Sequence, residues 1–349
     1  MKAAVLHGKE DVRIEEVPER SLDDGEVRVK IGAALTCGTD LKVFKRGYHA
    51  KMIVPPAVFG HELAGEIVET ASGAGEWSVG ERVVVLNSAP CSQCDSCGRD
   101  QQGLCDDLLF LNGAYAGSVV VPARIASKNM LRLRPETPFV AAALCEPLAC
   151  VVLGATESGL ARGQKVLVIG SGPIGLMFVR LASFLGCDVT LIGRGESRLN
   201  AGRKLGASNV HEAASASASA LGPDPFAMLL QEWKGRFDVV IEAVGKPEAW
   251  EAAVRFVRKG GRVNFFGGCP SGTMVRLDTG LIHYSNLTLN ASFHHTPATT
   301  RRALELIEQG VVRSEDFVDG ACDLDRLPEL FKSMASGNRA IKTLVNVSE

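Results

Sequence analysis

The sequence comprises 349 residues, of which 46% are hydrophobic and 22% charged, with a formal net charge of -2. This length is typical of about two domains, each able to bury a hydrophobic core. Lysine and arginine are dispersed, which excludes a basic footprint for nucleic acid or a polybasic patch for a membrane, so small molecules are the expected partners.

The first part of the chain is rich in strands. Short β-branched runs occur at 27–31, 65–69 and 82–86, separated by Gly, Pro and Asp turns. This pattern predicts a partly open β-barrel domain. The opening residues MKAAVLHGKE do not read as a secretory leader, and no apolar run of membrane length is expected, so we expect a cytoplasmic protein.

Three candidate metal ligands are dispersed over separate motifs. Cys37 lies in Cys-Gly-Thr-Asp, His61 in Gly-His-Glu and Glu146 in Cys-Glu-Pro. One thiolate, one imidazole and one carboxylate can hold a zinc ion and leave a coordination position open, as catalytic zinc requires. Each residue alone is more often structural, as a small hydrophobe, a hydrogen-bonded core histidine or an interdomain carboxylate. Their joint occurrence favours the metal site.

Four cysteines, Cys91, Cys94, Cys97 and Cys105, lie together in a polar stretch. The two-residue gaps let successive thiolates face one centre, and the return to Cys105 adds a fourth ligand, which predicts a tetrahedral zinc site. Two disulfides are the alternative, and a reducing compartment disfavours them. Four protein ligands leave no place for a substrate, so this zinc would be structural.

From Val166 the pattern changes to strand, glycine-rich turn and helix, which predicts a parallel sheet wrapped by helices. The domain boundary should lie near 147–160. A buried strand leads into a turn and helix that contain Gly170, Gly172, Pro173, Ile174 and Gly175. The three glycines suit a tight turn, the approach of a pyrophosphate and close helix packing, respectively. Because another strand follows at 188–192, we expect a dinucleotide site; a simple glycine-rich turn is the alternative.

The end of that second strand indicates which dinucleotide is bound. NAD usually requires Asp or Glu there, whereas this chain has Gly193 and Arg194. Arg194 and Arg198, one helical turn apart, can hold a 2′-phosphate through charge-assisted bonds. The alternative is that both are solvated and neutralised by Glu196. We therefore expect NADP(H) in preference to NAD(H).

Later strands at 237–244 and 262–266 continue the sheet, and their carboxyl ends should line the nicotinamide site near Val244 and Gly267. The small-residue segment at 211–225 is interpreted as a loop and partly helical excursion without functional content. Thr296 should cap a helix with Pro297 in its first turn.

Together these motifs resemble the zinc-containing medium-chain dehydrogenase/reductase family over essentially the whole chain. The matching segments are Cys37–Asp40, Gly60–Glu62, Gly80–Val83, the four-cysteine lobe, the glycine-rich turn and the closing strand near Lys342–Val347. The resemblance implies an α/β protein with a β-rich partner domain. Residues 1–150 and 288–349 would form a GroES-like, partly open β-barrel catalytic domain, and 151–287 a Rossmann domain with a doubly wound parallel sheet.

The resemblance also implies site residues and assembly. Cys37, His61 and Glu146 would be zinc ligands, and Glu62 would lie against the metal and exchange with Glu146 or water. Each chain would carry one catalytic and one structural zinc. A homotetramer is implied, with the strand 287–290 near an interface and a dimer as the alternative.

Within the family, Glu146 is typical of the polyol and threonine dehydrogenase branch, and the Gly193, Arg194 and Arg198 arrangement resembles its NADP(H)-dependent ketose reductases. This implies hydride transfer between NADP(H) and a secondary alcohol or ketone, with a polyol or sugar-derived substrate. An NAD-dependent L-threonine 3-dehydrogenase is one alternative, although Lys42 stands where those enzymes usually carry a histidine. A non-catalytic NADPH-binding member of the fold is another, and it would have no need of an open metal site.

Four further residues are candidates for the site. Thr39, two residues past a ligand, is placed to take the alcohol proton; a hydrogen bond to backbone is its alternative. By the resemblance, Phe44 stands where sorbitol dehydrogenases carry a substrate-binding tyrosine, and His294 about where polyol dehydrogenases present an arginine. Phe293 would lie beside the cofactor. His294 is equally consistent with a polar turn residue.

Overall fold

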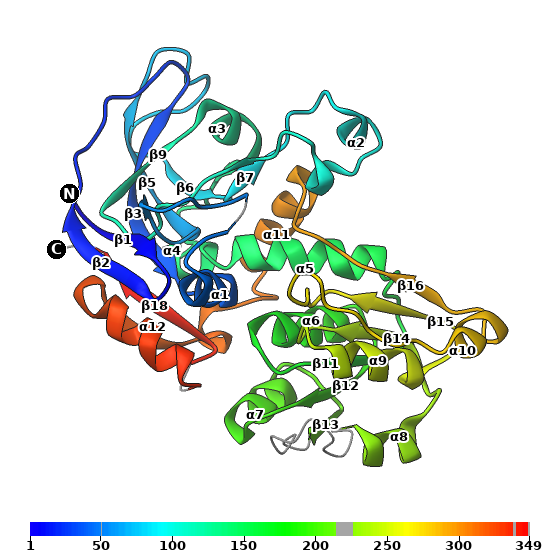
Figure 1. Ribbon diagram of the computed structural model, residues 1–349. Coiled ribbons are helices and arrows are strands. Elements are labelled where there is room, and N and C mark those ends of the chain that lie inside the picture. The colour runs from blue at the N-terminus through cyan, green and yellow to red at the C-terminus, as the bar shows by residue number, and fades with distance from the viewer. Residues whose placement is uncertain (50, 214–225, 338–339, 348–349) are drawn as a thin grey trace. The chain divides into compact units, whose positions relative to one another are not determined.

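The computed structural model describes residues 1–49, 51–213, 226–337 and 340–347, and Figure 1 shows their helices and strands. The chain divides into unit 1, Met1–Ala149 with His295–Glu349, and unit 2, Cys150–His294. Residues 214–225, most of the predicted excursion at 211–225, lie outside the described residues.

The main sheet of unit 1 takes its strands from both ends of the chain. Over the described residues its order is β10-β6-β5-β3-β18-β17, and β9 also pairs with β3. These strands are β3 (Val27–Leu35), β5 (Glu62–Thr70), β6 (Arg82–Val85), β9 (Ser118–Val121), β10 (Met130–Arg132), β17 (Val318–Asp323) and β18 (Lys342–Asn346). The three β-branched runs in the sequence correspond to β3, β5 and β6, and the predicted β-rich domain is confirmed.

The pairing of β3 brings three distant segments to one end of this sheet. Leu35 lies opposite Glu62 on β5, and it also lies opposite Leu344 on β18. Residues that follow β3, that begin β5 and that begin β18 therefore come together. This end of the sheet carries the first candidate site.

Alternation along β3 explains how unit 1 builds its core. Val27, Val29 and Ile31 are buried, and Lys30 between the last two is exposed. Arg28 departs from the alternation, because it is buried with its guanidinium bound to Glu69. Phe44, Phe59, Tyr115 and Phe331 add an aromatic group to the same core.

The smaller elements of unit 1 complete its layers. A second sheet has the order β2-β1-β4, and a two-stranded sheet pairs β7 with β8. The strands are β1 (Lys2–Gly8), β2 (Asp11–Glu16), β4 (Ala57–Val58), β7 (Ser88–Ala89) and β8 (Leu109–Phe110). The helices are α1 (Gly38–Arg46), α2 (Asp95–Gly98), α3 (Ala123–Asn129), α4 (Phe139–Ala142), α11 (Pro297–Glu308) and α12 (Leu327–Ala335), with short turns η1 (Gln102–Leu104), η2 (Ser314–Asp316) and η3 (Leu324–Arg326).

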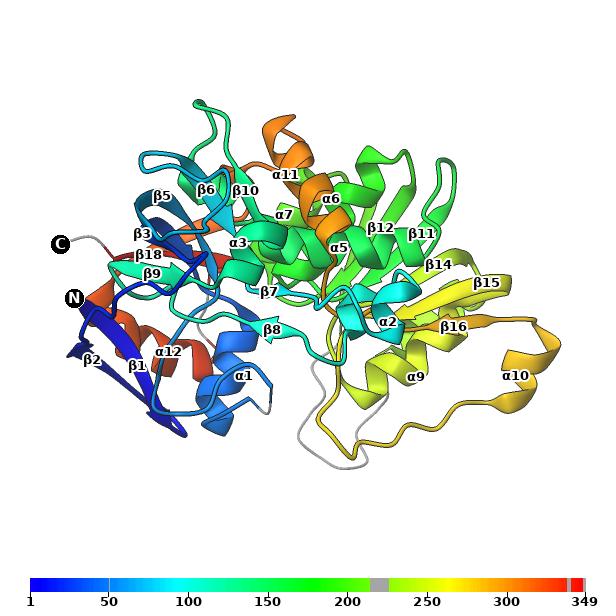
Figure 2. The same ribbon diagram turned by 90° about the horizontal axis from the view of Figure 1, so that it is seen from above.

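Unit 2 contains a parallel sheet in the order β13-β12-β11-β14-β15-β16. In chain order this is 3-2-1-4-5-6, the order of a Rossmann sheet, so the predicted doubly wound fold is confirmed. Figure 2 shows the sheet with α6, which packs on β11 and β12, and α9, which packs on β14 and β15. The strands are β11 (Lys165–Ile169), β12 (Asp188–Gly193), β13 (Asn209–Glu212), β14 (Phe237–Glu242), β15 (Val257–Phe265) and β16 (Thr288–Asn290). The helices are α6 (Pro173–Phe184), α7 (Glu196–Lys204), α8 (Ala227–Trp233), α9 (Pro247–Phe256) and α10 (Thr279–Tyr284).

Two helix starts follow from local sequence. Gly172 is the N-cap of α6 with Pro173 in the first turn. Thr296 caps α11 through a capping box with Thr299, as its place before Pro297 predicts. The helix α5 (Cys145–Glu157) crosses the boundary between the two units.

One stretch of described helix, Phe139–Glu157, is long and apolar enough to cross a membrane, contrary to the expectation that no apolar run reaches that length. Of its most apolar window, 78% is buried inside the protein. Burial of this kind is typical of a core helix.

Candidate functional site

The first candidate site begins where β3 ends. Cys37 is the N-cap of α1, and its sulfur accepts a hydrogen bond from the Thr39 amide at 3.4 Å. The Asp40 carboxylate completes a capping box, because Oδ2 accepts a hydrogen bond from the Cys37 amide at 3.1 Å. The cap fixes the position of the Cys37 side chain at the start of the helix.

Three potential ligand atoms converge at this point. One ligand atom each from Cys37, His61 and Glu62 lies within 4.8 Å of the others. His61 is 3% exposed and Glu62 is 0% exposed, so both side chains are shielded from water. A thiol, an imidazole and a carboxyl at this separation form a donor set that fits Zn²⁺.

Asp40 orients the histidine of this group. Its Oδ1 lies 2.8 Å from Nδ1 of His61, and Asp40 is 1% exposed. A negative charge beside Nδ1 favours the proton on that nitrogen and leaves Nε2 as the metal-binding atom. Asp40 belongs to the Cys-Gly-Thr-Asp motif, but the sequence alone indicated no role for it. The spacing of a cap residue and an acidic residue three positions later is the signal that points to it.

The electrostatics of the group favour protonated side chains without a cation. Burial raises the pKa of the Cys37 thiol, and the Glu62 carboxylate adds to the rise. Burial lowers the pKa of His61, but Asp40 and Cys37 outweigh it and the net shift is well upward. Metal ligands bind in deprotonated form, so a divalent cation would displace these protons.

Glu62 is bound by a buried lysine, Lys342. The sequence indicated this residue only as part of the closing strand. Lys342 Nζ donates to Oε1 of Glu62 at 2.6 Å and to Oε2 at 2.5 Å, and also to the Thr36 carbonyl at 3.2 Å. Burial raises the pKa of Glu62 although Lys342 opposes the shift. A lysine at the start of a strand is normally solvated, so the sequence gives no signal for this pair.

Glu146 lies in the first turn of α5 and is buried. Among the described residues, the ligand atoms of Cys37, His61 and Glu62 lie within 4.8 Å of one another, and Glu146 is not a member of this group. Burial raises the pKa of Glu146 to about 7, while the charge of His61 opposes the shift. The neighbouring Cys145 points elsewhere, because its thiol donates to the Thr300 carbonyl at 3.4 Å.

Thr39 and Phe44 both lie on α1 but in different surroundings. Thr39 is half-buried beside the cap residue. Phe44 is buried, and its ring stacks on Phe331 with centroids 5.5 Å apart. Phe44 therefore packs in the hydrophobic core of unit 1, and nothing in its contacts supports the expected substrate role.

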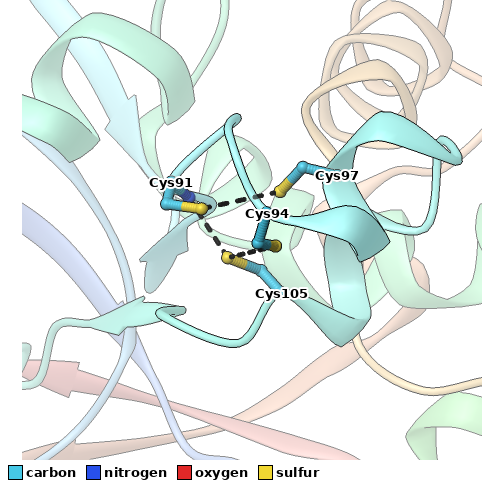
Figure 3. A group of neighbouring side chains, drawn as sticks. All are labelled: Cys91, Cys94, Cys97 and Cys105. Atoms are coloured by element: carbon cyan, nitrogen blue, oxygen red, sulfur yellow. Dashed lines mark hydrogen bonds between the residues drawn. The ribbon is translucent and has the colours of Figure 1, made fainter.

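The four cysteines predicted to share a zinc ion lie together in unit 1 (Figure 3). The sulfur of Cys91 is 4.0 Å from that of Cys97, and the sulfur of Cys94 is 3.9 Å from that of Cys105. Four sulfurs tetrahedrally arranged at about 2.3 Å from a zinc ion would be about 3.8 Å apart. A disulfide needs a separation of about 2.05 Å, and all four cysteines are free. The arrangement fits a closed metal site.

Backbone and lysine contacts hold this lobe in place. The Cys91 amide donates to the sulfur of Cys105 at 3.2 Å, which joins the two ends of the lobe. Lys128 of α3 donates to the carbonyls of Pro90 and Cys91 and to the Ser92 hydroxyl. The pKa of Cys91 is lowered to about 6, chiefly by the hydrogen bond from the Gln93 amide, which favours its thiolate, whereas burial raises the pKa of Cys105 to about 12. A zinc ion binds the thiolate form.

In unit 2 the glycine-rich turn has the geometry that a close-packed strand and helix need. A side chain at Gly175 would meet the Gly170 carbonyl at 1.8 Å, so only glycine fits there. Gly170 has a φ of 122°. At Gly172, the N-cap of α6, an added Cβ would meet nothing within 4 Å, so the space beside this residue is open. Ile174 follows Pro173 in the first turn of α6.

The end of β12 is fixed by Ser171. A Cβ on Gly193 would lie 2.3 Å from that of Ser171. The Ser171 hydroxyl also donates to the Arg194 carbonyl at 2.9 Å and accepts from the Arg194 amide at 3.0 Å. Arg194 is exposed and Arg198 is half-buried on α7. Sequence reasoning missed Ser171, although its place between two of the motif glycines singles it out.

The ends of β14 and β15 lie close to each other. Oε1 of Glu242 accepts hydrogen bonds from the amides of Val244 and Gly245 at 2.8 and 2.9 Å. A Cβ on Gly267 would lie 2.4 Å from the Gly245 nitrogen, so glycine is required there. Val244 is 41% exposed.

Phe293 and His294 lie at the end of unit 2. Phe293 is exposed, and its ring centroid lies 5.7 Å from that of His294. His294 has a φ of 67°, in the left-handed region that few residues other than glycine adopt. Such strain is often found at functional positions, and here it coincides with a predicted substrate residue.

Comparison with known proteins agrees with the two kinds of unit found in the fold. Residues 23–132 match the alcohol dehydrogenase GroES-like domain, and residues 173–309 match the zinc-binding dehydrogenase model. Sorbitol dehydrogenase of Bacillus subtilis is 28% identical over 99% of this chain and 97% of its own length. D-altritol 5-dehydrogenase of Agrobacterium fabrum is 32% identical over 84% of each chain.

A solved structure is similar over nearly the whole chain. It is a putative zinc-binding dehydrogenase from Sinorhizobium meliloti bound to NADP, with a TM-score of 0.85 and 27% identity. The match covers 99% of this chain and 98% of the other.

Proposed function

The chain belongs to the zinc-containing medium-chain dehydrogenase/reductase family, and from this premise we propose that it transfers a hydride between NADP(H) and a secondary alcohol or the matching ketone. A polyol or a sugar-derived compound is the proposed substrate. The observation that carries the proposal is the group of half-buried Cys37 with buried His61 and Glu62, a donor set separate from the four-cysteine lobe. A protein that used only the fold and the cofactor would have no need of it.

We propose that Cys37, His61 and Glu146 hold the catalytic zinc, with Glu62 against the metal. When bound, the zinc would act as a Lewis acid on the substrate oxygen. Asp40 lies beside Nδ1 of His61 and favours the proton there, which leaves Nε2 as the atom that would bind the metal. The Lys342 contact satisfies both oxygens of Glu62, which favours Glu146 as the resting carboxylate ligand.

The proposed role of Thr39 is to take the alcohol proton. Its amide is bound to the sulfur of Cys37, which keeps the residue beside the ligand. A hydroxyl can accept one proton while it donates its own to a neighbour, so it can relay a proton without carrying a full charge.

NADP(H) is the proposed cofactor, bound at the N-terminus of α6. When bound, its nicotinamide would donate or accept the hydride. The turn Gly170–Gly175 would receive the pyrophosphate. β12 itself ends in Gly193, without a carboxylate of its own, and the Glu212 carboxylate of the neighbouring β13 accepts a hydrogen bond from the Gly195 amide at 3.4 Å. The hydrogen bonds of Ser171 fix the backbone from which Arg194 extends. Arg194 and Arg198 would contact the 2′-phosphate. The NADP found in the similar Sinorhizobium meliloti structure supports this choice.

We also propose a homotetramer, with β16 near an interface. β16 ends the described sheet of unit 2, and an edge strand offers unpaired backbone groups for pairing with another copy. Light scattering of the purified protein would measure the assembly.

Initial rates on zinc-replete protein test the function. NADP⁺ and NAD⁺ are compared in parallel with polyols, L-threonine and simple secondary alcohols. Turnover of polyols with a preference for NADP⁺ is the expected result. A preference for NAD⁺ would overturn the cofactor proposal, turnover of L-threonine alone would replace the substrate class, and no turnover of any compound would contradict both.

A further inference from the structure

Tyr115 joins the elements that carry the proposed zinc ligands. It is 0% exposed in unit 1. Its amide donates to the Phe59 carbonyl at 2.9 Å, and its carbonyl accepts from the Ala4 amide at 2.8 Å. The residue is thus held on both sides by backbone.

The ring of Tyr115 covers the residue before His61. Gly60 has a φ of 89°, and a Cβ placed there would lie 2.7 Å from the Tyr115 ring. The amides of Gly113 and Ala114 also donate to the Gly60 carbonyl at 2.8 and 3.1 Å. The backbone that presents His61 is therefore packed against the ring of Tyr115 and the residues just before it.

The hydroxyl of Tyr115 lies between two acceptors. It is 2.6 Å from Oδ2 of Asp40 and 3.1 Å from the Leu35 carbonyl. A phenol has one proton, and the shorter contact to a carboxylate is the stronger bond, so the proton is donated to Asp40. Burial and the Asp40 carboxylate raise the pKa of Tyr115 well above its ordinary value, which keeps it a donor.

Asp40 receives three contacts, and two of them involve proposed metal ligands. Oδ1 faces His61, whereas Oδ2 accepts from the Cys37 amide and from Tyr115. If the phenol were absent, Oδ2 would keep only the Cys37 amide among these partners. The Asp40 carboxylate would then be free to rotate, and Cys37 and His61 would no longer be held by a fixed hydrogen-bond partner.

We propose that Tyr115 is a positioning residue for the catalytic metal: its hydroxyl fixes the carboxylate of Asp40, and Asp40 in turn places Cys37 and His61. The inference rests on the proposed function, because it takes these two residues to be zinc ligands. It assigns to one phenol, 75 residues away from Asp40 in the chain, a share of the metal affinity.

A role confined to core packing does not account for the hydroxyl. The ring lies 5.7 Å from Phe59 and 6.2 Å from Phe331, centroid to centroid, and a phenylalanine would fill the same space. A buried hydroxyl is costly unless it is hydrogen-bonded. We therefore assign the function of the Tyr115 oxygen to its hydrogen bond with Asp40.

Tyr115→Phe tests the inference in the full-length, zinc-loaded protein. Zinc is removed stepwise with a competing chelator, so that the four-cysteine site in the same molecule serves as the internal control. We expect affinity at the catalytic site to fall about tenfold, at the low end of the range for outer-shell partners, and affinity at the structural site to stay unchanged. With Co²⁺ at the catalytic site, we expect the visible absorption bands to shift.

Two further variants separate positioning from general destabilisation. Phe331→Leu alters the same aromatic core from α12, and should lower the melting temperature without a selective loss of catalytic zinc. If Tyr115 acts through Asp40, Tyr115→Phe should add nothing to the loss of zinc affinity in an Asp40→Asn background. This non-additivity would persist even if the single variant proved less stable.

The outcomes distinguish the inference from the proposed function. Wild-type protein that binds only one zinc per chain would overturn both. Two zinc ions in the wild type, with equal affinities and equal Co²⁺ spectra in Tyr115→Phe, would overturn the role of Tyr115 alone. Selective, non-additive loss at the catalytic site supports it.

Discussion

Asp40 and His61 form a contact of 2.8 Å between Oδ1 and Nδ1, in a place where both side chains are almost fully buried. Asp40 also closes the capping box of α1 through its other oxygen. One carboxylate thus sets the start of α1 and the orientation of an imidazole that lies just before β5.

Asp40→Asn should weaken the catalytic zinc by roughly 10- to 100-fold, because an amide keeps the shape but loses the charge that orients His61. Zinc content after dialysis against a weak chelator measures the effect. Asp11→Asn, which removes an exposed carboxylate paired with Arg13, is the matched control and should retain both zinc ions. Equal retention in the two variants would contradict the role of Asp40.

Glu146→Ala should abolish turnover and lower the zinc content by about one ion per chain, since it removes one of three protein ligands. Glu136→Ala, at an exposed position, is the control. Metal analysis and initial rates are measured on the same samples. Unchanged zinc and rate would remove Glu146 from the site.

Lys342→Met should destabilise the protein by about 3–5 kcal/mol, because it leaves the carboxylate of Glu62 buried without its charged partner. Urea unfolding of the zinc-free protein measures this without interference from the metal. Adding Glu62→Gln should restore much of the loss. A double variant no more stable than Lys342→Met alone would show that the pair is not the cause.

Arg194→Ala should raise the Michaelis constant for NADP(H) by about 10- to 100-fold, the equivalent of about 1.5–3 kcal/mol for a charged hydrogen bond, and that for NAD(H) far less. Arg203→Ala, in the last turn of α7, is the control. Equal effects on the two cofactors would rule out recognition of the 2′-phosphate.

Cys105→Ser should release about one zinc ion per chain and expose the lobe of residues 91–105 to proteases, because a structural zinc supplies the folding energy of such a loop. Cys322→Ser, outside the cluster, should do neither. A lobe that stays resistant after losing its metal would show that Lys128 and the backbone contacts hold it alone.

The predictable parts of this protein are those encoded locally. The order of glycines around Gly170 predicts the Rossmann unit, and the spacing of Cys91, Cys94, Cys97 and Cys105 predicts that their sulfurs meet, which they do. In both cases the interacting residues lie close together in the sequence. Close backbone packing restricts the first motif to glycine, and metal binding restricts the second to cysteine.

The surroundings of other residues depend on contacts with distant parts of the chain, which the local sequence does not indicate. The partner of Lys342 is 280 residues away, and a lysine in the sequence Lys-Thr-Leu-Val-Asn looks solvated until β18 joins β3. Phe44 was expected near the substrate, but α12 supplies Phe331 as its packing partner. Such positions are decided by tertiary packing, which overrides the local pattern.

The pairing of Glu62 with Lys342 also imposes an order in time. A ribosome that adds about 5–20 residues per second needs tens of seconds to make the 280 residues that separate them. Throughout that interval the nascent chain carries Cys37, His61 and Glu62 without the ammonium group that will neutralise the carboxylate. The buried carboxylate of Glu62 therefore gains its charged partner only when almost the whole chain has been made.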